Sequence, residues 1–452
     1  MSKWLYPGMR VKRWLCLALA GLILAVLGVD LFTGGRLLGD FARSIHQLEE
    51  RFIKDIYVWV AGVLIIAAGG VVITTGLLKA FQSVATVFLP GQEGRVADFI
   101  YARRSLGRGP KIVVIGGGTG LSVLLRGLKK YTSNLTAIVS VADDGGSSGR
   151  LRGDLGILPP GDIRNCLVAL ADKEPLMEEL LQYRFPSGEL AGHCLGNLLL
   201  AALTSVTGGF DQAVRGIGKV LAIRGQVLPV TLANITLCAE LNNGTLVQGQ
   251  SNITKSPGQI KKVFIKPNRC LPLPEALTAI QEADAIILGP GSLYTSIIPN
   301  LLVKGIPEEL TRSSAIKIYV CNVMTQPGET DGYTGSEHIQ AITDHAGKFL
   351  DYALFNIGQV PLKLRTRYRQ EGASPVLVDL VEIERLGIRA VYADLIHKSV
   401  VVRHHPDELA RAIMRLVLSN HELPGRIRYP RDYQKFGHKH AYPTQDYRSN
   451  KI

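Results

Sequence analysis

The chain has 452 residues, a formal net charge of +13 and six cysteines, and its mean hydropathy of +0.17 is high for a soluble enzyme. The cysteines are scattered without a C-x-x-C pair, which argues against a disulfide framework or a zinc site and fits reduced thiols in a cytoplasmic domain. The charge is compatible with nucleic-acid binding. We expect none, because basic residues beside a membrane and a phosphate site account for it.

Two apolar segments dominate the first ninety residues. No charge occurs in 14–29 or in 56–78, and the first segment continues past Asp30 to Phe32. About 20 apolar residues span a bilayer, so we predict transmembrane helices at about 14–32 and 56–78, within a membrane anchor over 1–90. A cleaved signal peptide and a buried core helix are the alternatives.

Basic residues predict the orientation of this anchor. They precede the first apolar segment and follow the second, whereas the connecting segment is balanced in charge. The positive-inside rule then places both termini and the large domain in the cytoplasm, at the inner (cytoplasmic) membrane. The segment 40–55 would lie outside, where it could form a short amphipathic helix.

From about Lys111 the pattern predicts alternating strands and helices. The expected strands are 111–115, 135–142, 285–288, 316–321, 353–357 and 376–378, and the expected helices are 163–171, 176–183, 195–206 and 211–221. Residues 228–250 alternate at period two around a hairpin turn at Asn242-Asn243-Gly244. We therefore predict an α/β domain over 91–420: a Rossmann-like, mostly parallel sheet with an inserted hairpin and helical region, preceded by two transmembrane helices. The segment 421–452 is expected to be a basic, flexible tail.

The first expected strand leads into a glycine loop. The loop consists of Gly116, Gly117, Gly118, Thr119 and Gly120. Glycines allow close approach to a phosphate, and the following helix offers free N–H groups. A ligand-free tight turn is the alternative. Leu121 occupies the last position of a dinucleotide fingerprint, which counts against an NAD-dependent oxidoreductase, and no Walker A lysine follows.

Two further loops carry acidic and polar residues. Asp143, Asp144, Gly145, Ser147 and Ser148 follow the second strand. Such carboxylates suit a ribose hydroxyl, a metal or a general base, and the serines suit a phosphate; a mobile, solvated loop is the alternative. In the loop 159–165, Asp162, Arg164 and Asn165 are candidates, although Asp162 could simply be a helix N-cap.

A second strand–loop–helix cradle contains Gly289, Gly291, Ser292 and Tyr294. Two such loops on one sheet indicate a diphosphate or two separate phosphates. His193 and Asn197, one helical turn apart, are weaker candidates on a shared helix face. Asn322 and the polar loop 328–333 are candidates for base or sugar contacts, with plain loops as the alternative.

Taken together, these motifs resemble a known family. The segments 116–120, 143–151, 159–165, 192–200, 289–301 and 321–333 are similar to the YvcK gluconeogenesis-factor branch of the CofD-like family. The resemblance covers about 111–416 and leaves the two apolar segments outside it.

The resemblance implies a Rossmann-like core that binds UDP-sugars such as UDP-N-acetylglucosamine and is linked to cell shape, peptidoglycan synthesis and gluconeogenic growth. Tyr368 and Arg403 look like the family's UDP-sugar contacts; a tyrosine can stack on uracil and an arginine can pair with a diphosphate. No cofactor is expected to be required. The expected partners are the nucleotide sugar, the membrane, cell-wall synthesis proteins and further copies of the chain.

The CofD branch implies an alternative, namely transfer of a phospholactyl-type group from a nucleotide diphosphate donor with bound magnesium. Asp143, Asp144 and Asp162 resemble its acidic set and are the candidate catalytic residues. Arg164 stands where that branch tends to have a further acid. This cation favours plain diphosphate binding, so whether the chain is an enzyme stays open at this point.

Overall fold

The computed structural model describes residues 11–33, 55–88, 106–172, 175–397 and 401–420. The chain divides into two compact units, Met1–Arg103 and Arg104–Ile452. The expected amphipathic helix in 40–55 and the expected flexible tail 421–452 lie outside the described residues.

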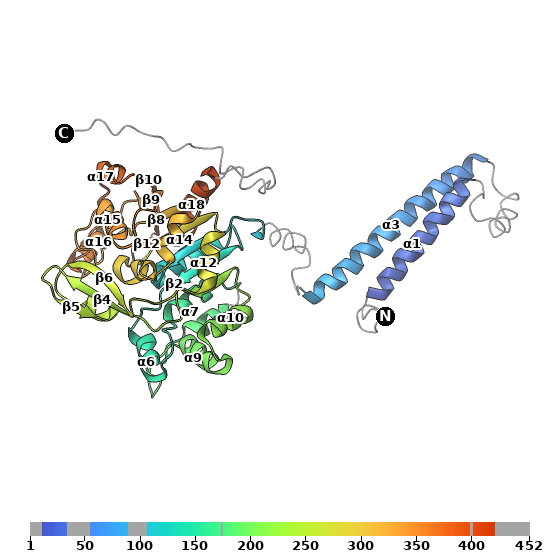
Figure 1. Cartoon of the computed structure of the whole chain (residues 1–452). Coiled ribbons are helices and arrows are strands. Elements are labelled where there is room, and N and C mark those ends of the chain that lie inside the picture. Colours follow the sequence, from blue (N-terminus) through green and yellow to red (C-terminus); the bar gives the residue numbers. More distant parts are fainter. Residues whose placement is uncertain (1–10, 34–54, 89–105, 173–174, 398–400, 421–452) are drawn as a thin grey trace. The chain divides into compact units, whose positions relative to one another are not determined.

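The first unit contains two long apolar helices, α1 (Val11–Phe32) and α3 (Asp55–Phe88), which run side by side (Figure 1). By length and composition, Arg13–Phe32 and Trp59–Ser83 could each cross a membrane. Both expected helices are thus present, and α3 continues ten residues beyond the predicted end of its span at residue 78.

Small residues allow these two helices to pack backbone to backbone. Gly62, Gly69 and Gly76 recur every seven residues along one side of α3. A Cβ atom on Gly69 would lie 2.8 Å from the backbone nitrogen of Ala25 and 2.8 Å from the carbonyl oxygen of Gly21. Close approach through small residues is the usual basis of helix pairing in a bilayer.

The second unit is built on a seven-stranded sheet in the order β10-β9-β8-β7-β1-β2-β3, in which every pair of neighbours is parallel. Its strands are β1 (Ile112–Gly116), β2 (Leu135–Val139), β3 (Gln226–Pro229), β7 (Ala285–Leu288), β8 (Ile316–Val320), β9 (Tyr352–Asn356) and β10 (Arg389–Ala393). The strand order reverses between β1 and β7. Ligands of open α/β sheets bind at the carboxyl edge beside such a reversal.

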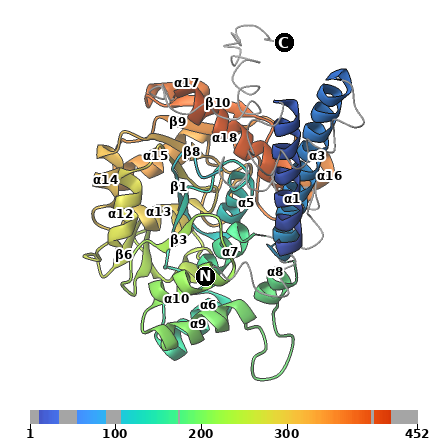
Figure 2. The same ribbon diagram turned by 90° about the vertical axis from the view of Figure 1, so that its right-hand side faces the viewer.

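Helices cover both faces of this sheet, which explains why its strands are nearly continuous apolar runs. Figure 2 shows α12 and α14 on one side of β1 and β8, and α5 and α18 on the other. The helices are α5 (Gly118–Leu128), α6 (Gly146–Leu155), α7 (Gly161–Leu170), α8 (Pro175–Gln182), α9 (Leu195–Thr207), α10 (Phe210–Val220), α12 (Pro274–Gln281), the π-helix η3 (Leu293–Ile297), α13 (Ile298–Leu301), α14 (Ile306–Arg312), α15 (Gly335–Ala346), α16 (Leu362–Gln370), α17 (Leu380–Arg385) and α18 (Pro406–Asn420).

The predicted insertion is present as a separate antiparallel sheet, in the order β5-β4-β6. It consists of β4 (Thr236–Leu241), β5 (Leu246–Gln248) and β6 (Ile260–Lys266), and α11 (Gln250–Ile253) follows β5. The turn falls at the predicted triplet, where Gly244 has a φ of 80°. The start of the alternating segment 228–250 does not belong to this antiparallel sheet. Residues 228 and 229 are part of β3, which pairs in the parallel sheet.

Two predictions at the C-terminal side need correction. Residues 376–378 do not form a strand; only the single bridges Met324–Pro375 and Thr334–Leu377 occur there. The last strand of the sheet is β10 instead. The short antiparallel pair β11 (Ile396–His397) and β12 (Arg403–His404) was not predicted, because two-residue strands carry too little periodicity to be recognised.

Candidate functional site

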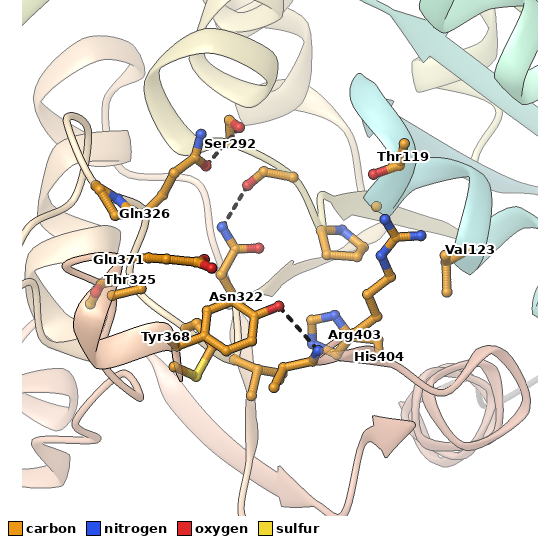
Figure 3. Close-up of a pocket in the computed structure, with 18 residues that line it drawn as sticks. Thr119, Val123, Ser292, Asn322, Thr325, Gln326, Tyr368, Glu371, Arg403 and His404 are labelled. Atoms are coloured by element: carbon orange, nitrogen blue, oxygen red, sulfur yellow. Dashed lines mark hydrogen bonds between the residues drawn. The ribbon is translucent and has the colours of Figure 1, made fainter. Parts of the chain in front are cut away.

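A cavity of about 330 Å³ opens at the carboxyl edge of the sheet, beside the reversal of strand order (Figure 3). The loops after β1, β7 and β8 meet there with α16 and β12. The polar and glycine residues that line it are Thr119, Gly120, Gly291, Ser292, Asn322, Thr325, Gln326, Tyr368, Glu371, Arg403 and His404.

The first glycine loop connects β1 to α5, and two of its positions require glycine for different physical reasons. Gly118 has a φ of 71°, which disfavours any side chain. At position 120 there is no room for a side chain, because a Cβ atom would lie 2.5 Å from the carbonyl oxygen of Pro290 in the second loop. Thr119 and Gly120 face the cavity from the first turn of α5, where backbone N–H groups have no partner within the helix.

The second glycine loop follows β7 and is held from behind by hydrogen bonds. Gly289 has a φ of 75°. The side-chain amide of Asn322 donates to the carbonyl oxygen of Gly291 at 2.8 Å, and the hydroxyl of Ser292 donates to Oε1 of Gln326 at 2.7 Å. Asn322 and Ser292, which the sequence predicted as ligand contacts, both line the cavity.

A buried carboxylate occupies the start of the helix after this loop. Glu329 is 3% exposed and accepts hydrogen bonds from the backbone N–H of Tyr294 at 3.2 Å, from the Thr295 hydroxyl at 2.7 Å and from Nε2 of Gln326 at 2.9 Å. Burial raises the pKa of Glu329 to about 7, and the donated hydrogen bonds act in the opposite direction. In the sequence Glu329 was only one residue of a polar loop, since nothing local marks it as buried.

Tyr294 does not line this cavity. Its side chain is buried, and its hydroxyl is hydrogen-bonded to that of Tyr333 at 2.9 Å. The ligand contact expected from the sequence is therefore absent from the cavity, because the helix directs this ring into the core.

Tyr368 and Arg403 come together in the cavity from α16 and β12. The hydroxyl of Tyr368 accepts a hydrogen bond from the backbone N–H of Val402 at 3.2 Å, which joins the two elements. Figure 3 shows the Arg403 side chain directed toward Thr119 and Val123. Arg403 thus lies beside the first glycine loop, and Tyr368 lines the same cavity.

Asp162 lies behind the first glycine loop, in the first turn of α7. The cap of that helix is Pro160, so Asp162 is not its N-cap. It instead accepts a hydrogen bond from the backbone N–H of Gly118, and burial raises its pKa to about 6, with a further contribution from the charge of Asp143. A Cβ atom on Gly117 would lie 2.7 Å from Oδ2 of Asp162, so the carboxylate and the loop are in direct contact.

The other two acids accept backbone hydrogen bonds, Asp143 from a nearby residue and Asp144 from a distant one. Asp143 accepts a hydrogen bond from the N–H of Gly145 at 3.0 Å, and Asp144 accepts one from the N–H of Ser251 at 2.8 Å. Asp144 therefore fixes the inserted sheet to the main domain. Among the described residues, no group of three or more His, Cys, Asp or Glu side chains is arranged to hold a metal ion.

The remaining candidates form a buried polar cluster next to α7. The hydroxyl of Ser147 is 3.2 Å from Nδ1 of His193 and accepts a hydrogen bond from Nδ2 of Asn197 at 3.2 Å. Arg164 donates to the side-chain oxygens of Asn197 and Asn165, each at 2.8 Å. Because α9 begins at Leu195, His193 and Asn197 do not share a helix face; Ser147 brings them together. None of the five lines the cavity.

Two further candidate residues accept hydrogen bonds that hold the loops in place. The carbonyl oxygen of Gly116 accepts a hydrogen bond from Nδ2 of Asn300 at 3.1 Å, and the hydroxyl of Ser148 accepts one from the N–H of Gly161 at 3.1 Å. These bonds fix the first glycine loop and the loop before α7, on which the cavity and Asp162 depend.

Comparison with known proteins places this arrangement in a family. Residues 112–396 match the family described as 2-phospho-L-lactate transferase CofD. The chain belongs to the CofD family. The resemblance inferred from the loop motifs is thereby confirmed. The match covers all seven strands of the parallel sheet and ends before β12.

Relatives of this CofD-family chain fall into two lengths. A protein from Nostoc sp. is 47% identical over 425 residues, covering 91% of this chain and 92% of its own. The gluconeogenesis factor of Bacillus subtilis is 50% identical over 315 residues, covering 69% of this chain and 99% of its own. A crystal structure of a UPF0052-family protein from Bacillus halodurans has a TM-score of 0.67 at 51% identity, covering 68% of this chain and 99% of its own. These figures confirm the predicted α/β fold.

Proposed function

We propose that this chain binds a UDP-sugar such as UDP-N-acetylglucosamine and acts as a regulatory protein held at the cytoplasmic membrane. The observation that carries the proposal is the meeting of Arg403 and Tyr368 with the first glycine loop in one cavity. Its helix N-terminus and guanidinium suit a diphosphate, and the tyrosine ring suits a nucleobase or a sugar.

The physiological part of the proposal comes from the relatives. The Bacillus subtilis protein is named a gluconeogenesis factor, and we propose that this chain likewise supports growth on gluconeogenic carbon sources. Links to cell shape and peptidoglycan synthesis, contacts with cell-wall synthesis proteins and self-association belong to the same proposal. They would follow if a cell-wall precursor is the ligand that the cavity senses.

The second candidate function is transfer of a phospholactyl-type group from a nucleotide diphosphate donor with magnesium. The family match favours it, as does the contact of Asp162 with the first glycine loop. Two observations count against it. Asp144 is hydrogen-bonded to the backbone of Ser251, and Arg164 contributes a cation where the transferases tend to have an acid.

Calorimetric titration of the full-length protein in detergent with UDP-N-acetylglucosamine, with and without magnesium, tests the proposal. We expect saturable binding, recovery of intact ligand, and a loss of about tenfold or more in affinity for Tyr368→Ala and for Arg403→Ala. Arg365→Ala is the matched control, because this exposed arginine lies on α16 outside the cavity.

Absence of binding by the wild-type protein would refute the sugar-nucleotide proposal. Cleavage of the ligand only when magnesium is present would favour the transferase instead. Equal losses in Arg365→Ala and Arg403→Ala would show that the cavity is not the binding site.

A further inference from the structure

The cavity has two ends of opposite hydrogen-bonding character. At one end lie the backbone N–H groups of Thr119 and Gly120, in the first turn of α5, and the guanidinium of Arg403, all of which are donors. At the other end lie Ser292, Gln326 and Glu371 (Figure 3). The sequence predicted that both glycine loops bind phosphate. The hydrogen bonds around Glu329 lead to a different assignment for the second loop.

Glu329 determines the direction of a chain of hydrogen bonds that ends at the cavity. Its carboxylate accepts from Tyr294, from Thr295 and from Nε2 of Gln326. Since the amide nitrogen of Gln326 faces Glu329, its oxygen faces Ser292 and accepts the hydroxyl hydrogen of that serine at 2.7 Å. A serine hydroxyl has one hydrogen, so the side chain of Ser292 has only lone pairs left for a ligand.

A phosphate oxygen is a poor occupant for such a group. It also carries lone pairs and no hydrogen at neutral pH, so it would meet the Ser292 hydroxyl without a hydrogen bond. Its charge would also lie on the same side as the carboxylate of Glu371 and the ionised form of Glu329. The pairing of Glu371 with Arg367 at 3.2 Å reduces only part of that charge. The backbone N–H of Tyr294, in the first turn of the following helix, is already taken by Glu329.

We infer that Glu329 makes the Ser292 end of the cavity a subsite for a neutral hydrogen-bond donor, such as a sugar hydroxyl or the imide N–H of a base. Phosphate then lies only at the end formed by Thr119, Gly120 and Arg403. This inference rests on the proposed function and adds an orientation to it. Glu329 is a positioning residue here, since it acts through Gln326 and Ser292 and does not line the cavity itself.

Two variants separate the two ends when each is titrated with UDP-N-acetylglucosamine and with inorganic pyrophosphate. Ser292→Ala removes the acceptor, so affinity for the nucleotide sugar should fall about 3- to 10-fold, the range for one hydrogen bond. Affinity for pyrophosphate should stay within about twofold, because no phosphate is expected near Ser292. Ser205→Ala removes an exposed hydroxyl on α9 and is the control.

Glu329→Gln tests the direction of the hydrogen bonds. The new amide presents a donor, which lets the Gln326 amide turn and frees the Ser292 hydrogen for the cavity. We expect weaker binding of the nucleotide sugar and a several-fold gain in pyrophosphate affinity. Thermal unfolding of each variant checks that the fold is retained, and Ser292→Ala decides the question if Glu329→Gln does not fold.

Three other outcomes of these titrations would contradict the inference or the proposed function. If Ser292→Ala weakens pyrophosphate as much as the nucleotide sugar, the second loop is a phosphate site and the inference is wrong. If the wild-type protein binds pyrophosphate but not the nucleotide sugar, the proposed function fails, while the comparison of Ser292→Ala with wild type on pyrophosphate still decides the inference. Failure to bind pyrophosphate at all rejects the phosphate end as well.

Discussion

Each glycine loop of this protein has its own buried acid. Asp162 accepts a hydrogen bond from the N–H of Gly118 in the first loop, and Glu329 accepts one from the N–H of Tyr294, just after the second. Backbone N–H groups at helix starts are otherwise the donors that bind anionic ligands. Part of that donor capacity is thus used internally, and the positions of the remaining donors limit where a phosphate can lie.

The pH dependence of stability should report on Asp162. Its pKa of about 6 in the folded protein is above the ordinary value of 3.8. The folded state therefore binds this proton more tightly than the unfolded state, and the resulting stability is fully present below about pH 4 and is lost as pH rises through 6. Asp162→Asn cannot undergo this loss, so it should be more stable than wild type above pH 6, by about 1–3 kcal/mol.

Thermal unfolding of both proteins between pH 4 and pH 8 measures this difference. Asp154→Asn, which removes an exposed carboxylate on α6, controls for the loss of one charge. A stability difference between Asp162→Asn and wild type that does not change across this range would contradict the prediction.

At the scale of the elements, the two glycine loops lie so close together that one added methyl group at Gly120 should disturb their contact. A Cβ atom on Gly120 would lie 2.5 Å from the carbonyl oxygen of Pro290, and backbone atoms cannot move aside cheaply. We expect Gly120→Ala to destabilise the protein by about 1–3 kcal/mol, the usual cost of overpacking, and to weaken binding in the cavity. Denaturant unfolding and calorimetry measure the two effects.

Gly153→Ala is the matched control, because this helical glycine of α6 has open space around its Cα atom. Alanine there should be neutral or stabilising by up to about 1 kcal/mol. If Gly120→Ala behaves like Gly153→Ala, the close approach of the two loops is not required for stability.

Local patterns were sufficient to predict the strands at the centre of the sheet, the first helices of the domain and the three strand–loop–helix junctions. Runs such as 112–116 and 285–288 are apolar on both faces, as buried parallel strands are, and each ends at glycines whose role follows from backbone geometry. The strands β6, β10, β11 and β12 and the helices from α12 onward were not predicted, because their residues are specified by contacts across the fold more than by periodicity.

The structure brings predicted site residues together where position along the sheet decides it, and separates them where packing decides it; their ligand contacts stay predictions. Ser292, Asn322, Tyr368 and Arg403 line the cavity as expected, since loops at one edge of a parallel sheet meet. Asp144, Arg164 and Tyr294 have internal partners instead. The partners Ser251, Asn197 and Tyr333 lie between 33 and 107 positions away, and only the folded chain reveals them.

For the molecule as a whole, we predict that the two apolar helices α1 and α3 act as a membrane anchor. The spans Arg13–Phe32 and Trp59–Ser83 contain few charges, so the full-length protein should sediment with membranes and resist extraction at alkaline pH. A fluorescent protein fused to the C-terminus should be active in the cytoplasm, and alkaline phosphatase inserted between α1 and α3 should be active outside. Release by alkali, or the opposite pattern of activities, would contradict the anchor or its orientation.

The packing of α18 on α5 affects how this protein is made. Gly127 of α5 lies directly against the backbone of Pro406 at the start of α18, and β12 adds Arg403 beside the first glycine loop. The first helix of the domain therefore meets its last partner only when nearly the whole chain has left the ribosome. A product that terminates near residue 400 would have both glycine loops but would lack Arg403 and His404 of the cavity lining, so we expect the cavity to be completed only late in synthesis.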